Sequence, residues 1–252
     1  MRVATWNVQH GRGADGVVDL DRFAAAVASL DADVLALQEL DRGQARSGGA
    51  DLPAVAAQAW GASAWRFAPA LAGAPGAWRP ARGEADGPAY GVALLSRRPV
   101  RSWRAVPLPV LPVRAPRLRR GRPPVLVPDE PRTALVAELD GVAVACAHLT
   151  WAPGWGLVQL RRLVRALPPG PAVVLGDLNL GAAGARAGSG LDVLVRAATT
   201  PVAAPRRQLD HVLGRGVRGV AARTAALPVS DHRAVLAEIS APSPAGDPRH
   251  TA

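Results

Sequence analysis

Four short apolar runs in this sequence each end on side chains that can perform acid–base or metal chemistry. The first ends at Asn7, the second at Glu39, the third at His148, and the fourth at Asp177 with Asn179 close behind. Buried strands that end at one edge of a sheet place such side chains in a shared crevice, where ligands commonly bind. A single polar strand end is common, but four of these residue types predict a functional site.

Two acid–histidine pairs near the C-terminus, Asp210-His211 and Asp231-His232, add proton-transfer groups. A carboxylate beside a histidine fixes its tautomer and stabilises its protonated form. Carboxylate and amide oxygens favour hard cations such as Mg²⁺ over Zn²⁺. A hard cation, an acid that orients water and a histidine together describe hydrolysis of a phosphate ester. Because neighbouring strand residues point to opposite faces, we expect His211 to be structural and Asp210 to act in the site.

Strands and a few helices must position these groups. Strands are predicted over 2–7, 34–37, 92–96, 133–139, 142–148, 172–175, 208–213, 217–224 and 233–239. Helices are predicted over 19–30, 52–60, 156–167 and 191–198. Asp140-Gly141 is a strong two-residue turn signal and predicts a hairpin between two of the strands.

The basic charge is concentrated in one segment. All 30 basic residues are Arg, and the formal net charge is +10. Residues 97–132 hold ten Arg against Asp129 and Glu130, a net of +8, together with many prolines. Proline disfavours helix and central strand, so we predict an exposed loop over about 107–131. Arg132, which enters a strand beside this loop, is our candidate for contact with a substrate phosphate.

Length and composition are typical of one globular domain. The chain has 252 residues, of which 49% are hydrophobic, and we expect a domain over 1–240 with a disordered tail over 241–252. One cysteine excludes an internal disulfide. No apolar run approaches the roughly 18 residues of a membrane span. Without a secretory signal pattern at the N-terminus, we expect a cytoplasmic protein, and we expect a monomer.

Several motifs together resemble the endonuclease/exonuclease/phosphatase superfamily, in the family's order. They are Thr-Trp-Asn at 5–7, Leu-Gln-Glu at 37–39, Gly-Val-Ala-Leu-Leu-Ser-Arg at 91–97, Ala-His-Leu at 147–149, Gly-Asp-Leu-Asn at 176–179, Leu-Asp-His-Val at 209–212 and Ser-Asp-His-Arg at 230–233. The resemblance implies an α/β fold, a four-layer α/β/β/α sandwich with two packed mixed β-sheets and the site at one end. A histidine at position 148 is similar to the pancreatic-type deoxyribonuclease, sphingomyelinase and inositol-phosphatase branches.

The resemblance also implies a role for each matching residue. Mg²⁺, for which Mn²⁺ can substitute, would be held by Asn7, Glu39 and Asp231. Asp177 would orient or deprotonate the attacking water, and Asp210 would orient His232, which binds the phosphate. The implied catalytic residues are His148, Asp177, Asn179, Asp210 and His232.

We therefore expect a metal-dependent phosphoesterase that cleaves phosphodiester bonds, with nucleic acid as the leading substrate. A lipid, sugar or other small phosphate ester is the alternative substrate. A catalytically silent binding protein would be expected to have lost a metal or histidine residue, and none is missing. A zinc hydrolase is disfavoured because no His-x-x-x-His or cysteine pair has the usual spacing.

Overall fold

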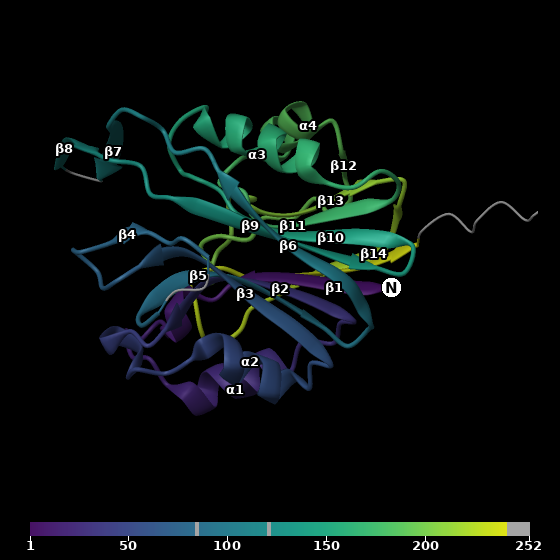
Figure 1. Cartoon of the computed structure of the whole chain (residues 1–252), viewed down its shortest axis with the longest axis horizontal. Coiled ribbons are helices and arrows are strands. Elements are labelled where there is room, and N and C mark those ends of the chain that lie inside the picture. The colour runs from purple at the N-terminus through teal and green to yellow at the C-terminus, as the bar shows by residue number, and fades with distance from the viewer. Residues whose placement is uncertain (84–85, 120–121, 241–252) are drawn as a thin grey trace, which may run out of the picture.

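The computed structural model describes residues 1–83, 86–119 and 122–240, so the expected tail over 241–252 lies outside the described residues. Two mixed β-sheets pack face to face, and a pair of helices covers the outer face of each (Figure 1). This is the expected four-layer α/β/β/α sandwich. No helix among the described residues is both long enough and apolar enough to cross a membrane.

The first sheet has the order β14-β15-β1-β2-β5-β3-β4. Its strands are β1 (Arg2–Asn7), β2 (Val34–Arg42), β3 (Ala64–Ala72), β4 (Arg79–Pro80), β5 (Ala89–Ser96), β14 (Arg218–Ala225) and β15 (Ala234–Ser240). Only β1 and β2 pair in parallel, and the other neighbours are antiparallel. Helices α1 (Leu20–Ala28) and α2 (Leu52–Trp60) cover its outer face.

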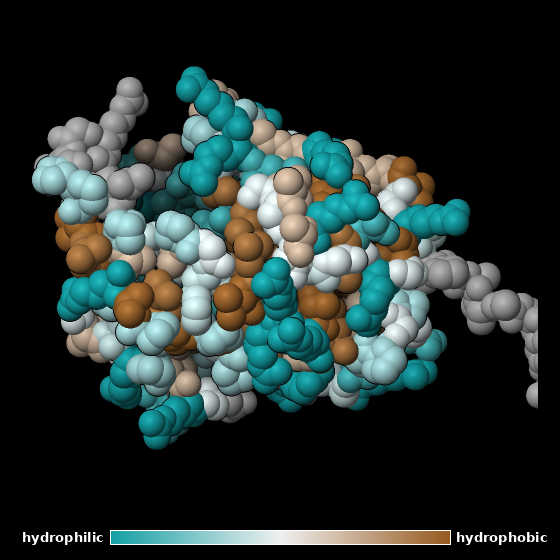
Figure 2. Space-filling view, turned by 90° about the horizontal axis from the view of Figure 1, so that it is seen from above, coloured by the Kyte–Doolittle hydropathy of each residue, from teal (hydrophilic) through white to brown (hydrophobic). Residues whose placement is uncertain are grey.

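The second sheet has the order β12-β13-β11-β10-β9-β6. Its strands are β6 (Val100–Leu108), β9 (Arg132–Leu139), β10 (Val142–His148), β11 (Ala172–Asp177), β12 (Asp192–Val193) and β13 (Asp210–Arg215). Here β10 and β11 form the parallel pair. Helices α3 (Trp155–Ala166) and α4 (Ala182–Ser189) lie on the outer face. Figure 2 looks onto this helical side, where hydrophilic and hydrophobic side chains are interspersed.

Central strands read as continuous apolar runs because both of their faces are buried. Along β1 and β2, Val3 and Val34 point into the core between the sheets, whereas Ala4 and Leu35 point toward α1 and α2. Helix α1 begins where expected, because the Asp19 carboxylate accepts a hydrogen bond from a first-turn amide.

The predicted helix over 191–198 is wrong. Residues Asp192–Val193 form the edge strand β12, and the Leu194 amide donates to the carbonyl of Val212 in β13. A short apolar run fits a helix or an edge strand equally well, and pairing with β13 decides the outcome here. The sequence patterns also left β3, β6 and α4 unassigned. Prolines at 69 and 107 obscure the two strands, which tolerate them beside a bulge or at a sheet edge.

The loop predicted over 107–131 is wrong in part, because it contains a two-stranded hairpin. Strands β7 (Ala115–Arg119) and β8 (Arg122–Val127) pair only with each other and project at the end opposite the N-terminus (Figure 1). Proline is tolerated in such a ribbon because each strand has an unpaired edge.

Hydrogen bonds hold the base of this hairpin to the loop that follows β10. The Asp129 carboxylate accepts from the Leu111 amide at 2.9 Å and from the Thr150 hydroxyl at 2.5 Å. Trp155 and Gln159 of α3 each donate to the carbonyl of Pro109 at 2.9 Å. The hairpin is therefore fixed at its base to the chain segment that carries His148.

The parallel pair β10–β11 depends on a glycine immediately before Asp177. Gly176 has a φ of +148°, and a Cβ there would lie 1.9 Å from the Ala147 carbonyl oxygen of β10. Ala147 is its partner in the strand register, and the next partners are His148 and Asp177. Absence of a side chain at 176 thus permits the close approach that sets these two residues side by side.

We predict that Gly176→Ala lowers the free energy of unfolding by at least about 3 kcal/mol, because overpacking adds to an unfavourable backbone conformation. The matched control is Gly184→Ala in α4, where the nearest atom to a new Cβ is 3.8 Å away and alanine favours the helix. Urea denaturation of the two variants beside the wild type measures the difference. A loss below about 1 kcal/mol for Gly176→Ala would contradict this account.

Candidate active site

The carboxyl ends of β1, β10 and β11 and a bulge within β2 bring the predicted residues together. The expectation that the second strand ends at Glu39 is wrong, because β2 continues to Arg42. The Asn7 side chain, on the last residue of β1, donates to Glu39 Oε1 at 2.9 Å and to Asp177 Oδ2 at 3.0 Å. Its own Oδ1 accepts from the Gln9 amide at 3.0 Å, so the NH₂ group faces the carboxylates. Asn7 therefore bridges a carboxylate of the first sheet and a carboxylate of the second.

Both predicted catalytic histidines face the same oxygen of Asp177. Its Oδ2 lies 3.6 Å from His148 Nε2 and 3.9 Å from His232 Nε2. The other ring nitrogen of His232, Nδ1, is 2.8 Å from Asp210 Oδ2. Asp210 is thus the hydrogen-bond partner of His232, and the four side chains form one buried cluster.

The two histidines have opposite charge preferences. Burial lowers the pKa of His148 well below its usual value, and the nearby charges of Arg132 and His232 lower it further. Burial also opposes charge on His232, but the hydrogen bond that it donates to Asp210 and the surrounding carboxylates outweigh it and raise its pKa to about 9. At neutral pH the site therefore holds one neutral and one protonated imidazole.

The Asp177 carboxyl is poised to exchange a proton near neutral pH. Burial, followed by the charge of Asp210, raises its pKa to about 7, while His232, Asn7 and the Asn179 amide act in the other direction. Burial likewise raises the pKa of Glu39. A carboxyl with a pKa near the working pH suits general-base chemistry.

Strained backbone conformations surround the site. Asn179 has a φ of +50°, donates its amide to Asp177 Oδ1 at 3.0 Å and donates its side chain to the Leu149 carbonyl. Glu39, with a φ of +60°, lies at a β-bulge between Leu37 and Leu40. The described non-glycine residues with positive φ all lie within three positions of a predicted site residue, and they are Gln9, His10, Glu39, Asn179 and Ser230. Such strain persists where the surroundings enforce it, which is typical of functional sites.

Arg132 and Asp231, the remaining predicted residues, differ in burial. Arg132 is only 7% exposed, donates to Glu130 at 3.1 Å, and its Nε has no partner among the described residues. Its charge acts on Glu39 and His148. Asp231 is exposed at the rim, and its charge acts on Glu39 and His232.

His211 points away from this cluster, as strand alternation predicts. Its Nε2 lies 2.8 Å from the Leu180 carbonyl oxygen, and its Nδ1 lies 3.2 Å from the Gln208 side chain. Sequence reasoning missed His10, Arg46 and Tyr90, whose pKa values are shifted by the charge of Glu39 or Asp231 among other causes. None of them follows the end of an apolar run, which was the pattern used to find site residues. Only the closeness of His10 to Asn7 in the sequence could have indicated that His10 lies near the site.

The donor set fits a hard divalent cation. Glu39, Asp177 and Asp231 supply carboxylates in one region, and the buried Oδ1 of Asp210 has no hydrogen-bond partner in the described structure. Ligand atoms of Asp177, Asp210 and His232 lie within 4.8 Å of one another. Crowded carboxylates with raised pKa values are stabilised by a bound cation.

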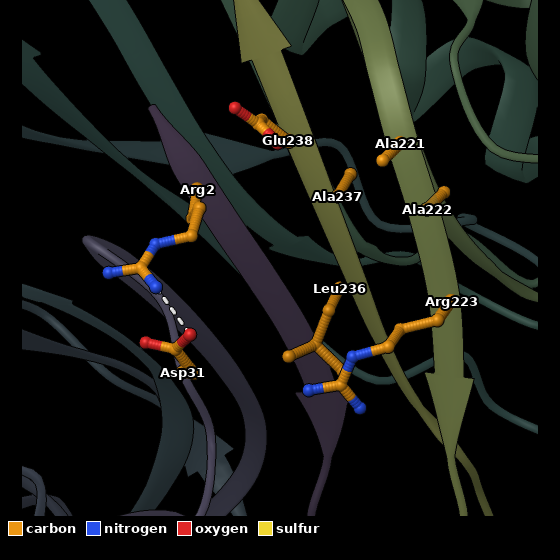
Figure 3. A pocket seen from close by; sticks show the side chains of 8 residues that line it. All are labelled: Arg2, Asp31, Ala221, Ala222, Arg223, Leu236, Ala237 and Glu238. Atoms are coloured by element: carbon orange, nitrogen blue, oxygen red, sulfur yellow. Dashed lines mark hydrogen bonds and ion pairs between the residues drawn. The ribbon is translucent and has the colours of Figure 1, made fainter.

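A shallow pocket of about 180 Å³ elsewhere on the first sheet carries no comparable chemistry (Figure 3). It lies on β1, β14 and β15, where Arg2 pairs with Asp31 and the remaining lining is mainly aliphatic. Arg2 opens β1, whereas Asn7 ends it, so the pocket and the cluster around Asn7 lie at opposite ends of that strand.

Solved structures share this fold. An endonuclease/exonuclease/phosphatase from Beutenbergia cavernae is 24% identical with a TM-score of 0.70, covering 95% of this chain and 71% of that one. A mannosyl-6-phosphatase from Bacteroides thetaiotaomicron is 12% identical with a TM-score of 0.63, covering 95% and 99%. D. rerio TDP2 in complex with a single-strand DNA product is 15% identical with a TM-score of 0.61, covering 95% and 98%. No curated protein sequence matches the chain.

The family comparison agrees with the geometry. The family model described as "Endonuclease/Exonuclease/phosphatase family" matches residues 4–232, which include every residue of the predicted site. The family's name covers hydrolases of phosphate esters, both nucleases and phosphatases. The chain belongs to the endonuclease/exonuclease/phosphatase family.

Proposed function

We propose that this protein is a divalent-metal-dependent phosphodiesterase whose leading substrate is nucleic acid. One observation carries the proposal: a buried Asp177 carboxylate faces a neutral and a protonated histidine within 4 Å and shares an asparagine with Glu39. This combination provides a proton acceptor, a fixed positive charge and a cation-binding carboxylate in one pocket.

Glu39 is the residue best suited to hold the cation, with Asp231 beside it and Asn7 orienting both buried carboxylates. The alternative set of Asp177, Asp210 and His232 is less suitable, because a proton is already shared between His232 and Asp210 at 2.8 Å. Bound Mg²⁺, or Mn²⁺ in its place, would neutralise charge on the phosphate as phosphorus is attacked.

The remaining groups accept a proton, stabilise charge or hold these groups in position. Asp177 accepts a proton from the attacking water, consistent with its raised pKa. Protonated His232 binds a phosphate oxygen and stabilises the added charge of the transition state, with Asp210 holding its ring. Neutral His148 donates a hydrogen bond to the phosphate or to the leaving oxygen. Asn179 fixes Asp177 through its backbone amide.

Nucleic acid is favoured by charge and by shape. Arg132 offers a guanidinium that is only 7% exposed and whose charge acts on Glu39 and His148 of the site. The β7–β8 ribbon belongs to the most basic segment of the sequence and projects from the end where the strands carrying the site terminate (Figure 1). The mannosyl-6-phosphatase relative supports a sugar phosphate as the second candidate substrate.

We predict that Asp177→Asn lowers kcat by at least about 10³-fold, because the amide cannot accept the proton. The assay is hydrolysis of bis-p-nitrophenyl phosphate, single- and double-stranded DNA and RNA, and mannose 6-phosphate, with Mg²⁺, Mn²⁺ or EDTA. Asp140→Asn, in an exposed turn remote from the site, is the matched control. Wild-type activity in Asp177→Asn, or activity that survives EDTA, would refute the mechanism.

We predict that Asp210→Asn lowers the pKa of His232 by at least about one unit, because the ionic partner is lost. Histidine ring resonances followed by NMR from pH 5 to 10 measure the change. Folding raises the pKa of His232, so its ion pair stabilises the fold fully below pH 6.5 and is lost as the pH rises through about 9. An unchanged titration in the variant would show that Asp210 does not hold the charge.

We predict that Arg132→Gln lowers kcat/KM for DNA about 10- to 100-fold, because one charge-assisted bond to phosphate is lost. Arg101→Gln, which removes an exposed arginine of the same sheet, is the control. Circular dichroism establishes that both variants fold. Equal kinetics for the two variants would remove Arg132 from the substrate site.

A further inference from the structure

A second cluster borders the site on the side of Glu39, and none of its members takes part in the chemistry above. It consists of Arg46, Trp78 and Tyr90. The guanidinium carbon of Arg46 lies 5.4 Å from the Tyr90 ring centroid and 5.9 Å from the Trp78 ring centroid. The two rings are 6.1 Å apart and tilted by 40°. A cation and two aromatic rings therefore converge on one place.

Arg46 is held rigidly by a buried acid. Its Nε and Nη2 each donate to the Asp41 carboxylate at 2.8 Å, and the Ser47 hydroxyl donates to the same carboxylate. Asp41 is completely buried, whereas the Arg46 side chain is 34% exposed. Nη1 makes no hydrogen bond to the described residues, so an oriented N–H donor remains available beside the rings.

The cluster is adjacent to the catalytic groups. Tyr90 lies opposite Asp41 in the strand register, two residues beyond Glu39 on β2. Charge on Glu39 acts on both Tyr90 and Arg46, and Arg46 also acts on His10, which in turn senses Asp231. The cluster therefore borders the site at Glu39.

Trp78 has the exposure expected of a contact surface. It lies in the connection between β3 and β4, is partly exposed, and belongs to a segment at the same end of the molecule as the β7–β8 hairpin (Figure 1). Indole stacks well on the flat face of a nucleobase, and an arginine N–H donates to the acceptor atoms of a base. A planar base can lie over the whole indole ring while it accepts from the arginine, so the pair of Trp78 and Arg46 suits a base.

We propose that Trp78 and Arg46 form a subsite that binds the nucleobase of the nucleotide next to the scissile phosphate, with Trp78 stacking on the base and Arg46 donating to it. The Tyr90 ring, whose centroid lies 6.1 Å from that of Trp78, supports the Trp78 ring. This proposal rests on the proposed function and adds which part of the substrate is recognised.

Binding can be measured without hydrolysis. In full-length Asp177→Asn protein, thymidine 5′-monophosphate is titrated with Mg²⁺ present, and the indole N–H resonances are followed by NMR, with Trp78 assigned from Trp78→Phe. 2-Deoxyribose 5-phosphate, which lacks only the base, is the matched ligand. We expect thymidine 5′-monophosphate to shift the Trp78 resonance and the sugar phosphate to leave it in place.

The kinetic test compares two esters of the same leaving group, thymidine 5′-(p-nitrophenyl phosphate) and methyl p-nitrophenyl phosphate. The quantity compared is kcat/KM for the thymidine ester divided by kcat/KM for the methyl ester. We expect Trp78→Ala to lower this ratio by about tenfold or more, and we expect Trp78→Phe to keep most of the wild-type ratio. Trp65→Ala, which removes an exposed tryptophan from the opposite end of β3, is the control and leaves the ratio unchanged.

Three results would overturn the proposal: equal shifts of Trp78 by both ligands, no shift by the nucleotide, or equal ratios in Trp78→Ala and the wild type. Equal shifts would assign the subsite to the sugar phosphate. Failure of the proposed function is distinct, because a protein that hydrolyses neither ester can still bind the nucleotide through Trp78.

Discussion

The structure depends on burying several carboxyl groups, among them Glu39, Asp177 and Asp210, close together and away from water. Without donors or cations beside them, these groups could not all be ionised. Asn7 resolves part of this conflict by donating both hydrogens of its side-chain amide, one to Glu39 and one to Asp177. Because these acids come from different sheets, the same bonds also join the two halves of the sandwich. The site forms only when both sheets are packed, so its geometry depends on the complete fold.

Electrostatics then distinguishes residues of identical type. His148 and His232 both face Asp177 Oδ2, yet only His232 has a carboxylate on its second nitrogen. The Asp210 partner produces a large difference in pKa between the two histidines, because a buried charge is strongly disfavoured unless a partner compensates it. Two histidines at similar distances from one oxygen thereby become a cation and a neutral donor.

Sequence patterns predicted the sandwich and the central cluster, because both follow from apolar strands that end in polar residues. Asn7, His148 and Asp177 are found where their strands end, and alternation along β13 correctly separated Asp210 from His211. The patterns failed at the periphery. The β7–β8 hairpin forms from prolines and arginines that carry no strand periodicity. Arg46 comes from a short 3-10 helix and Trp78 from the connection before β4, and only tertiary packing brings them together.

The anchoring of the hairpin base has a consequence for local unfolding. Asp129 ties the Leu111 amide to the Thr150 hydroxyl, and Pro109 receives two donors from α3. Opening the hairpin base therefore breaks bonds of the loop that follows His148, and the converse also holds. Segments linked in this way exchange their amide hydrogens as one cooperative unit, with a shared opening free energy. A ligand that orders the β7–β8 hairpin would thus also protect the loop that follows His148 from opening.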